Sequence, residues 1–274
     1  MKKTVLITGA SSGIGEITAI LLAEMGYKVY GAARSIDKMK PLESKGVSIV
    51  YLDLTNEESI VSCVETIISK EGRIDILINN AGYGSYGAIE DVPIEEARRQ
   101  FEVNLFGLAR LTQLVLPNMR QHKSGRIINV STIGGKVYSP FGGWYHASKH
   151  ALEGLSDCLR VETKPFGIDV VIIEPGGIKT PWGTIAAENL KKTSGNGAYA
   201  NFVNRVYNFM IKSYAEGKTL TEPKVIAELI VKAATTAKPK TRYVAGYMAK
   251  LALFMRKWLS DKMFDKIITS MYKE

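Results

Sequence analysis

Short apolar segments alternate with longer amphipathic segments along this chain. The short segments hold mainly β-branched and other apolar residues without polar alternation, which is typical of strands buried on both faces of a sheet. They predict seven strands, at residues 4–8, 29–33, 47–52, 74–78, 126–131, 168–173 and 242–245.

The longer segments carry apolar residues three and four positions apart, the spacing of an amphipathic helix. We expect helices at about 17–26, 57–70, 93–122 and 222–236, and one that holds Tyr145 and ends near Lys164. Strands and helices that alternate predict an α/β fold, a doubly wound parallel sheet covered on both faces. Such a sheet binds ligands at the carboxyl ends of its strands.

Composition and charge narrow the class of protein. The chain has 274 residues, 46% of them hydrophobic and 23% charged, which suits one or two ordinary globular domains. A net charge of +9 is compatible with anionic partners. The basic residues are dispersed and form no arginine-rich arm, so we do not expect nucleic acid as a partner.

The cysteines, the histidines and the first apolar run argue against a disulfide-rich, metal-binding, secreted or membrane-spanning protein. Cys63 and Cys158 lie far apart, as expected of two reduced thiols. His146 and His150 are four residues apart but have no third ligand, so no metal site is expected. The first apolar run is too short for a signal peptide, and no run has transmembrane length. We therefore expect a cytoplasmic protein.

A glycine-rich loop separates the first strand from the first helix. It reads Thr-Gly-Ala-Ser-Ser-Gly-Ile-Gly over residues 8–15. Glycines permit a tight turn and a close backbone approach to a pyrophosphate, which the helix N-terminus attracts. A loop without a ligand is the alternative, but the strand–loop–helix context favours a dinucleotide site. The candidate cofactor residues here are Gly9, Ser11, Ser12, Gly13, Ile14 and Gly15.

The end of the second strand bears on the choice of cofactor. An acid about 20 residues after the glycine loop binds the ribose 2′-hydroxyl of NAD, whereas an arginine there suits the 2′-phosphate of NADP. Arg34 lies at that distance, and no acid precedes Asp37. This favours NADP(H) over NAD(H), with a solvated loop arginine as the alternative.

Two further strand ends carry residues suited to a cofactor. Asp53, followed by Leu54, ends the third strand, where an acid can accept from an adenine amino group. The fourth strand ends in Asn-Asn-Ala-Gly, of which Asn80, Ala81 and Gly82 are cofactor candidates. Ordinary turn chemistry is the alternative for both.

Asn104 interrupts the apolar stripe of the helix that follows Pro93. A buried amide needs hydrogen-bond partners. One interpretation is a core asparagine satisfied by backbone. The other is a group that holds a water or a carbonyl near the active site.

Tyr145 and Lys149 lie four residues apart and therefore share one face of a helix. The reference pKa of tyrosine is about 10. A nearby ammonium group, together with an oxidised nicotinamide, would lower that pKa. The pair would then supply a general acid for carbonyl reduction or a base for alcohol oxidation. Two hydroxyl groups, Ser131 and Thr132, follow the fifth strand at the same edge.

Taken in order, these motifs resemble the classical short-chain dehydrogenase/reductase family. The residues that carry the resemblance span positions 1–185 and include the glycine loop, Asp53, residues 79–82, Asn104, the hydroxyls near Ser131, the Tyr145–Lys149 pair and Pro175-Gly176. The resemblance implies one Rossmann-like domain over residues 1–274, with about seven parallel strands between two helical layers. It also implies hydride transfer with nicotinamide, and homodimers or homotetramers built on the helices of Asn104 and Tyr145.

The resemblance also implies roles for single residues. Tyr145 would donate or accept the proton, Lys149 would bind the nicotinamide ribose, and Asn104 would anchor the water of a proton relay. The residues expected beside the nicotinamide are Pro175, Gly176, Ile178 and Thr180.

The catalytic hydroxyl departs from the common family pattern. The family's serine usually lies thirteen residues before the tyrosine, and this position holds Thr132. Its hydroxyl can still donate to a carbonyl, although the methyl group restricts its rotamers. We favour Thr132 over Ser131 and place both at the substrate.

The family's variable region suggests the substrate class. Residues 177–220 are expected to form a helical lid, and the aromatic candidates for substrate contact are Tyr138, Phe141, Trp144 and Trp182. They indicate a lipophilic substrate such as a steroid, retinoid or fatty acyl group. Packing of the lid onto the body is the alternative.

The last segment, residues 247–274, predicts a basic amphipathic helical extension. Such a tail can contact an anionic membrane, but packing on its own subunit or a neighbour is the more common outcome. The overall prediction is an NADP(H)-dependent oxidoreductase of a lipophilic ketone or secondary alcohol. The rival predictions are a catalytically silent nucleotide sensor or scaffold, and an epimerase or dehydratase without net cofactor turnover.

Overall fold

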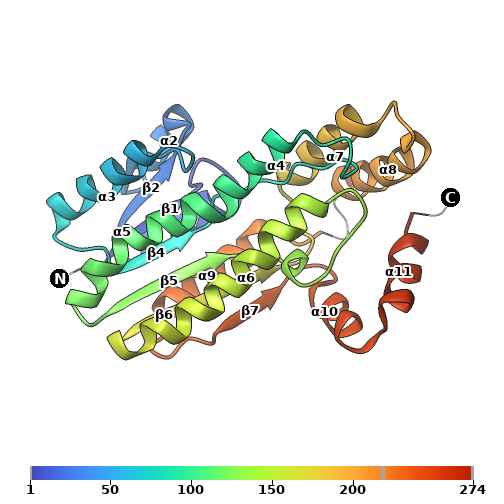
Figure 1. Ribbon diagram of the computed structural model, residues 1–274. Coiled ribbons are helices and arrows are strands. Elements are labelled where there is room, and N and C mark those ends of the chain that lie inside the picture. Colours follow the sequence, from blue (N-terminus) through green and yellow to red (C-terminus); the bar gives the residue numbers. More distant parts are fainter. Residues whose placement is uncertain (1, 217–219, 273–274) are drawn as a thin grey trace.

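Seven parallel strands form one sheet in the computed structural model, which describes residues 2–216 and 220–272 (Figure 1). The strand order is β3-β2-β1-β4-β5-β6-β7, and every neighbouring pair is parallel. The strands are β1 (Thr4–Thr8), β2 (Lys28–Ala33), β3 (Val47–Tyr51), β4 (Ile76–Asn79), β5 (Gly125–Val130), β6 (Ile168–Pro175) and β7 (Arg242–Ala245). The predicted parallel sheet of seven strands is confirmed.

Helices cover both faces of the sheet and give three layers (Figure 1). One face packs in an apolar cluster against α1 (Gly13–Glu24), α2 (Ile36–Glu43) and α9 (Pro223–Thr235). The other face packs against α3 (Glu57–Glu71) and α5 (Gly107–Gln121), and α6 (Gly143–Thr163) lies beside β6. Because both faces are covered, apolar residues dominate the strands, which is why the sequence shows no regular alternation of apolar and polar positions.

The long helix expected from Pro93 has an irregular turn in its middle. It consists of α4 (Ile94–Phe101), a π-helical turn at Glu102–Phe106 and α5. Pro93 itself is the residue before the first helical turn. Asn104 lies in the π-helical turn and is fully buried. Turns of this kind are frequent at functional sites.

One helix, α2, went unpredicted because its segment carries lysines and a proline. The first helix of the expected lid is α7 (Pro181–Ser194). Pro181 opens α7 at a first-turn position, where its missing N–H costs nothing.

The predicted lid is helical, formed by α7 and α8 (Ala200–Glu216), while residues 217–219 lie outside the described residues. The C-terminal extension comprises two helices, α10 (Ala249–Trp258) and α11 (Asp261–Ser270), with residues 273–274 outside the description. Figure 1 shows α7, α8, α10 and α11 together at the end of the molecule opposite the N-terminus. These elements surround the carboxyl end of the sheet.

Candidate active site

A cavity of about 850 Å³ runs along the carboxyl ends of the strands. It begins at the glycine loop and ends between α7, α10 and α11. The predicted cofactor residues that line it are Gly9, Ser11, Ser12, Gly13, Ile14, Arg34, Asp53, Leu54, Asn80, Ala81, Gly82, Tyr145, Lys149, Pro175, Gly176, Ile178 and Thr180. One cavity therefore joins the dinucleotide motif to the Tyr145–Lys149 pair.

The glycine loop has the shape that a dinucleotide requires. Gly9 and Gly13 have φ angles of +70° and +62°, a region that side chains other than glycine rarely adopt. Gly15 does not line the cavity, but a Cβ on it would lie 2.3 Å from the Gly9 carbonyl oxygen. Gly15 thus allows α1 to approach the loop closely, and the backbone at Gly13 faces the cavity. This cradle fits a pyrophosphate at the N-terminus of α1.

The loop after β4 is joined to the glycine loop by hydrogen bonds. The Thr8 hydroxyl accepts from the backbone N–H groups of Asn80 and Ala81 at 3.1 and 3.0 Å. The Asn80 amide donates to the Thr8 carbonyl oxygen at 3.0 Å. These bonds hold two strand ends together, so the cofactor cradle is fixed before any ligand binds.

Arg34 and Asp53 lie at the outer end of the cavity. Arg34 is exposed and lines the cavity, whereas Asp37 forms an ion pair with Lys40 on α2. Burial tends to raise the pKa of Asp53, but hydrogen bonds from Thr55 and the Arg34 charge hold it below its usual value. An ionised Asp53 beside a cation suits the adenosine end of a dinucleotide.

Tyr145 lies in an aromatic enclosure at the inner end of the cavity. Its ring centroid is 5.0 Å from that of Trp182 and 6.0 Å from that of Tyr86. Burial raises the pKa of Tyr145, and the nearby Thr132 hydroxyl opposes that rise. The predicted lowering depended on Lys149 together with an oxidised nicotinamide, and burial acts in the opposite direction. Desolvation of the phenolate dominates in so apolar a pocket.

Lys149 is buried on the same helix face, one turn after Tyr145. Its Nζ donates to the Val130 carbonyl oxygen at 3.0 Å. Burial lowers the pKa of Lys149 to about 8, although the Glu153 charge opposes the shift. Lys149 can therefore exchange its proton close to neutral pH.

The two candidate hydroxyls differ in their surroundings. Thr132 Oγ1 donates to the Pro175 carbonyl oxygen at 3.1 Å and lies within hydrogen-bonding reach of Tyr145. The Ser131 hydroxyl is buried without a partner that meets hydrogen-bond geometry, and it lies on the side of Glu153. Both residues line the cavity, but Thr132 is the one beside the tyrosine.

The Asn104 side chain is satisfied by the protein. Its Oδ1 accepts from the Tyr83 N–H at 3.0 Å, and its Nδ2 donates to the Tyr83 carbonyl at 2.9 Å and to Ser148 Oγ at 3.1 Å. Asn104 does not line the cavity. These contacts correspond to the core-asparagine interpretation and tie the segment after β4 to α6.

Two of the four aromatic candidates for substrate contact lie outside the cavity. Tyr138 and Trp182 line the cavity, whereas Phe141 and Trp144 do not. The Phe141 ring packs on Phe202 of α8, with centroids 5.0 Å apart, and the Trp144 ring packs edge-on against Phe101. We therefore do not retain Phe141 and Trp144 as substrate contacts, because their rings fix the loop before α6 and the start of α6 itself.

Sequence patterns missed several residues of the cavity wall. Tyr86 comes from a loop without periodicity, and the side chains from α10 and α11 come from a tail more than 100 residues away. His146 also lines the cavity and anchors the loop before α6. Its Nε2 accepts from the Ser139 N–H at 3.0 Å, and its Nδ1 contacts the Gly134 carbonyl at 2.9 Å. Its position directly after Tyr145 was the one available signal.

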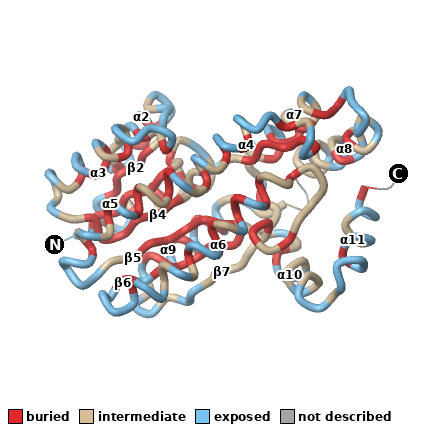
Figure 2. The backbone as a smooth tube through the Cα atoms, viewed as in Figure 1, coloured by how far each residue is buried: buried red, intermediate tan, exposed pale blue. Residues whose placement is uncertain are grey.

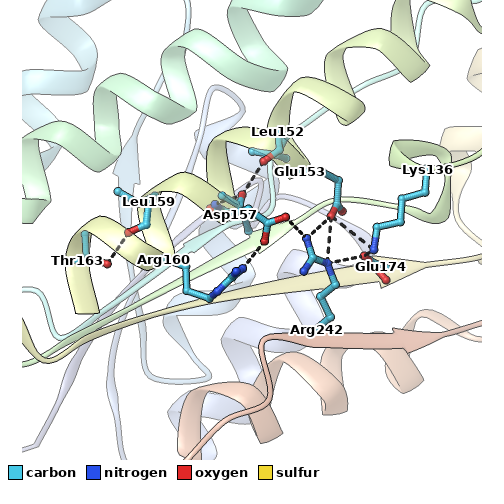
Figure 3. Close-up of polar contacts among 11 residues, drawn as sticks. Lys136, Leu152, Glu153, Asp157, Leu159, Arg160, Thr163, Glu174 and Arg242 are labelled. Atoms are coloured by element: carbon cyan, nitrogen blue, oxygen red, sulfur yellow. Dashed lines mark hydrogen bonds and ion pairs between the residues drawn. The ribbon is translucent and has the colours of Figure 1, made fainter. Parts of the chain in front are cut away.

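A partly buried charge network supports α6 from behind the site (Figure 3). Arg242 of β7 donates to Glu153 and Asp157 of α6 at 3.1 and 2.7 Å, and to Glu174 of β6 at 3.1 Å. Lys136 forms a second ion pair with Glu174 at 2.5 Å. Burial raises the pKa of Glu153. The network fixes the helix that carries Tyr145 and Lys149 relative to the last two strands.

Comparisons with known proteins agree with this geometry. The family model for short chain dehydrogenase matches residues 3–191. The 3-ketodihydrosphingosine reductase of Bacteroides thetaiotaomicron is 39% identical over 271 residues, covering 98% of this chain and 97% of the relative. The "Probable short-chain type dehydrogenase/reductase VdlC" of Helicobacter pylori is 38% identical over 262 residues, covering 96% and 95%.

A solved short-chain dehydrogenase from Streptomyces avermitilis has a TM-score of 0.80 and 32% identity, covering 99% of this chain and 95% of its own. Fold neighbours have been solved in complex with NADP and with NAD. The fold and cavity define a nicotinamide-dependent oxidoreductase. The chain belongs to the short-chain dehydrogenase/reductase family.

Proposed function

We propose that the protein transfers a hydride between NADP(H) and a lipophilic ketone or secondary alcohol, with Tyr145 as the general acid or base. The observation that carries the proposal is the single cavity shared by the glycine loop, the Tyr145 phenol and the Thr132 hydroxyl. It provides a cofactor cradle and two hydroxyl groups at one reaction centre.

Each reacting residue has a distinct task in ketone reduction. The nicotinamide, when bound, supplies the hydride. Tyr145 donates its phenolic proton to the carbonyl oxygen, and the Thr132 hydroxyl orients that oxygen by a hydrogen bond. Because burial disfavours the Tyr145 phenolate, the phenol remains protonated until charge develops on the substrate oxygen. Lys149, with a pKa of about 8, returns a proton toward the site after the transfer.

Arg34 supports the choice of NADP(H). It is an exposed cation on the cavity wall at the end of β2, and the first acid after it, Asp37, faces Lys40. A 2′-phosphate at this point gains a charge-assisted hydrogen bond, while a 2′-hydroxyl finds no carboxylate from that loop.

The far wall of the cavity supports a lipophilic substrate. Beyond Tyr145 it is lined by aromatic and aliphatic side chains, namely Tyr86, Trp182, Tyr214, Leu251, Met255, Phe264, Ile267, Ile268, Met271 and Tyr272. Such a wall favours an alkyl chain over a polar substrate. The relative from Bacteroides thetaiotaomicron is named for a reductase of a long-chain keto lipid, so 3-ketodihydrosphingosine is the first substrate to assay.

The experiment is a panel of carbonyl compounds with NADPH, followed by absorbance at 340 nm. We expect consumption of NADPH with 3-ketodihydrosphingosine or another long-chain ketone, and little with acetone-sized ketones. Binding of NADPH without its consumption on any member would instead support a silent sensor. Conversion of a substrate without net cofactor consumption would support an epimerase or dehydratase.

The assembly and the compartment are further parts of the proposal. The helices that carry Asn104 and Tyr145 expose the apolar side chains of Phe106, Leu155 and Val161. These exposed side chains support a homodimer or homotetramer. Light scattering coupled to size exclusion tests this. Cys63 and Cys158 form no disulfide, which suits the cytoplasm.

A further inference from the structure

The outward side of the C-terminal helices exposes large apolar side chains. Leu251, Phe254 and Trp258 of α10 are 50%, 62% and 67% exposed, and Met263 of α11 is 53% exposed. Spacings of three and four residues place the first three on one stripe of α10. Figure 2 shows that α10 and α11 consist mainly of exposed and intermediate residues. We call the surface formed by Lys250, Leu251, Phe254, Lys257, Trp258, Lys262 and Met263 the tail face.

The tail face belongs to helices that are firmly anchored. Phe264 of α11 is buried, and its ring centroid lies 5.2 Å from that of Tyr138. The Tyr138 hydroxyl donates to Asp265 at 2.8 Å, and Arg256 of α10 donates to Asp261 of α11 at 2.6 Å. The inner side therefore packs on the protein, and the exposure of Phe254 and Trp258 is not due to a loose tail.

The charges around the tail face are predominantly positive. Residues 249–272 hold five basic and two acidic residues. Both acids have partners within the protein, since Asp261 accepts from Arg256 and Asp265 accepts from Tyr138. Lys257 lies 5.3 Å from the Trp258 ring centroid and shares its side of α10. Aromatic side chains flanked by lysines are typical of helices that rest on anionic lipid headgroups.

The cavity opens beside this face. Leu251 of α10 and Met271 of α11 each line the cavity and are also half exposed, at 50% and 41%. Apolar side chains of the cavity wall therefore reach the surface on both C-terminal helices. Among the described residues no helix is long and apolar enough to cross a membrane.

We propose that the tail face docks the enzyme on an anionic lipid bilayer, with Phe254 and Trp258 inserted among the headgroups and the lysines paired with lipid phosphates. The cavity mouth then faces the bilayer, so a lipophilic substrate passes from the membrane to Tyr145 along α10 and α11. This second step rests on the proposed function, whereas the docking itself does not.

Vesicle flotation with the full chain tests the docking without using activity. We expect the protein to float with vesicles of phosphatidylcholine and phosphatidylglycerol at 3:1, about tenfold or more above pure phosphatidylcholine, and to be released at 1 M salt. Vesicles that carry dibrominated acyl chains should quench Trp258, so the Trp258→Phe variant should lose most of the quenching.

Matched variants locate the contact. Phe254→Ser with Trp258→Ser should reduce the partition coefficient about tenfold or more, since each aromatic loses its apolar burial. Lys250→Gln with Lys257→Gln should reduce it about fivefold per lysine. Met25→Ser with Tyr51→Ser is the control, because these side chains are 56% and 52% exposed at a distant part of the fold.

Absence of flotation with either vesicle type would overturn the proposal. A tail-face variant that converts an oligomer into a monomer, with no change in flotation, would also overturn it and assign the face to a second copy of the chain. NADPH consumption by the Phe254→Ser, Trp258→Ser variant on a detergent-dispersed ketone should match that of the unmodified enzyme. Loss of docking is thereby distinguished from failure of the proposed function, in which no ketone is reduced.

Discussion

The Thr132 hydroxyl, and not that of its neighbour Ser131, lies within hydrogen-bonding reach of the Tyr145 phenol. Thr132 Oγ1 also donates to the Pro175 carbonyl, which fixes it at the carboxyl end of β6. The Ser131 hydroxyl points to the other side of the loop, toward the buried Glu153. The two adjacent hydroxyls therefore have different surroundings, and we expect only Thr132 to act on the substrate.

Replacement of each hydroxyl tests this division. We expect Thr132→Val to lower kcat about 100-fold, because a donor to the developing oxyanion is lost. The kcat of Thr132→Ser, which keeps the hydroxyl, should stay within about tenfold of that of the unmodified enzyme. The loss of kcat in Ser131→Ala should be smaller than that in Thr132→Val. Steady-state kinetics on one ketone measures all three, and a larger loss in Ser131→Ala would reverse the assignment.

Removal of the Arg34 guanidinium should weaken the binding of NADPH but not that of NADH. Arg34→Ala should raise the KM for NADPH about tenfold or more, the size of one hydrogen bond to a charged group, and leave the KM for NADH unchanged. Lys38→Ala is the matched control, because Lys38 is an exposed cation on the adjoining α2. An equal effect of Arg34→Ala on both cofactors would contradict the proposed 2′-phosphate contact.

Stability should fall at mildly acidic pH because of His146. Burial lowers the pKa of His146 in the folded protein below its unfolded value of about 6.5. The unfolded chain then binds the proton more readily, so the free energy of unfolding is intact above about pH 6.5. It declines as the pH drops from there through the folded pKa, by at most about 1.4 kcal/mol per pH unit.

Denaturant unfolding at pH 7.5 and 5.0 measures this decline. His146→Gln should flatten it, while His122→Gln, which replaces an exposed histidine, should keep the original slope. A slope that His146→Gln leaves unchanged would assign the acid sensitivity to other groups, with Asp157 next in line, because burial tends to raise its pKa but Arg242 and Arg160 hold it below the usual value.

Arg242 should matter more for stability than a surface arginine. Arg242→Met leaves the buried Glu153 and Glu174 with less positive charge and should cost about 3 kcal/mol, somewhat reduced because Arg242 is 25% exposed. Addition of Glu153→Gln should recover part of that loss. Arg110→Met, which breaks an exposed pair with Glu57, should cost less than about 1 kcal/mol. Equal losses for Arg242→Met and Arg110→Met in denaturant unfolding would show that the network contributes little.

The parts of this molecule that local sequence determines could be predicted from the sequence. The strands are apolar on both faces, and the glycine loop, Arg34, Tyr145 and Lys149 each occupy a fixed place relative to a strand or helix. Thr132 could be placed by its spacing from Tyr145. The predictions that failed concern side chains whose positions depend on contacts between distant parts of the chain. Phe141 and Trp144 lie close to Tyr145 in sequence. In the fold, however, the Phe141 ring packs on Phe202 and the Trp144 ring packs on Phe101, outside the cavity.

The substrate wall and the pKa of Tyr145 were beyond sequence reasoning for the same reason. Tyr86 and the residues of α11 reach the cavity only through the fold, and the contact of the Trp182 ring with Tyr145 depends on how α7 packs on the body of the protein. The predicted lowering of the Tyr145 pKa depended on Lys149 together with an oxidised nicotinamide. Burial beside the rings of Tyr86 and Trp182, which come from two other segments, acts in the opposite direction.

The Tyr145→Phe variant tests whether Tyr145 is the general acid, by single-turnover reduction of a long-chain ketone with bound NADPH. Phenylalanine keeps the ring contacts with Tyr86 and Trp182 and removes only the proton donor. We expect unchanged NADPH binding, read from nicotinamide fluorescence, and a rate of hydride transfer lower by about 10²–10⁴-fold. A rate within tenfold of the unmodified enzyme, at equal NADPH occupancy, would show that Tyr145 is not the general acid.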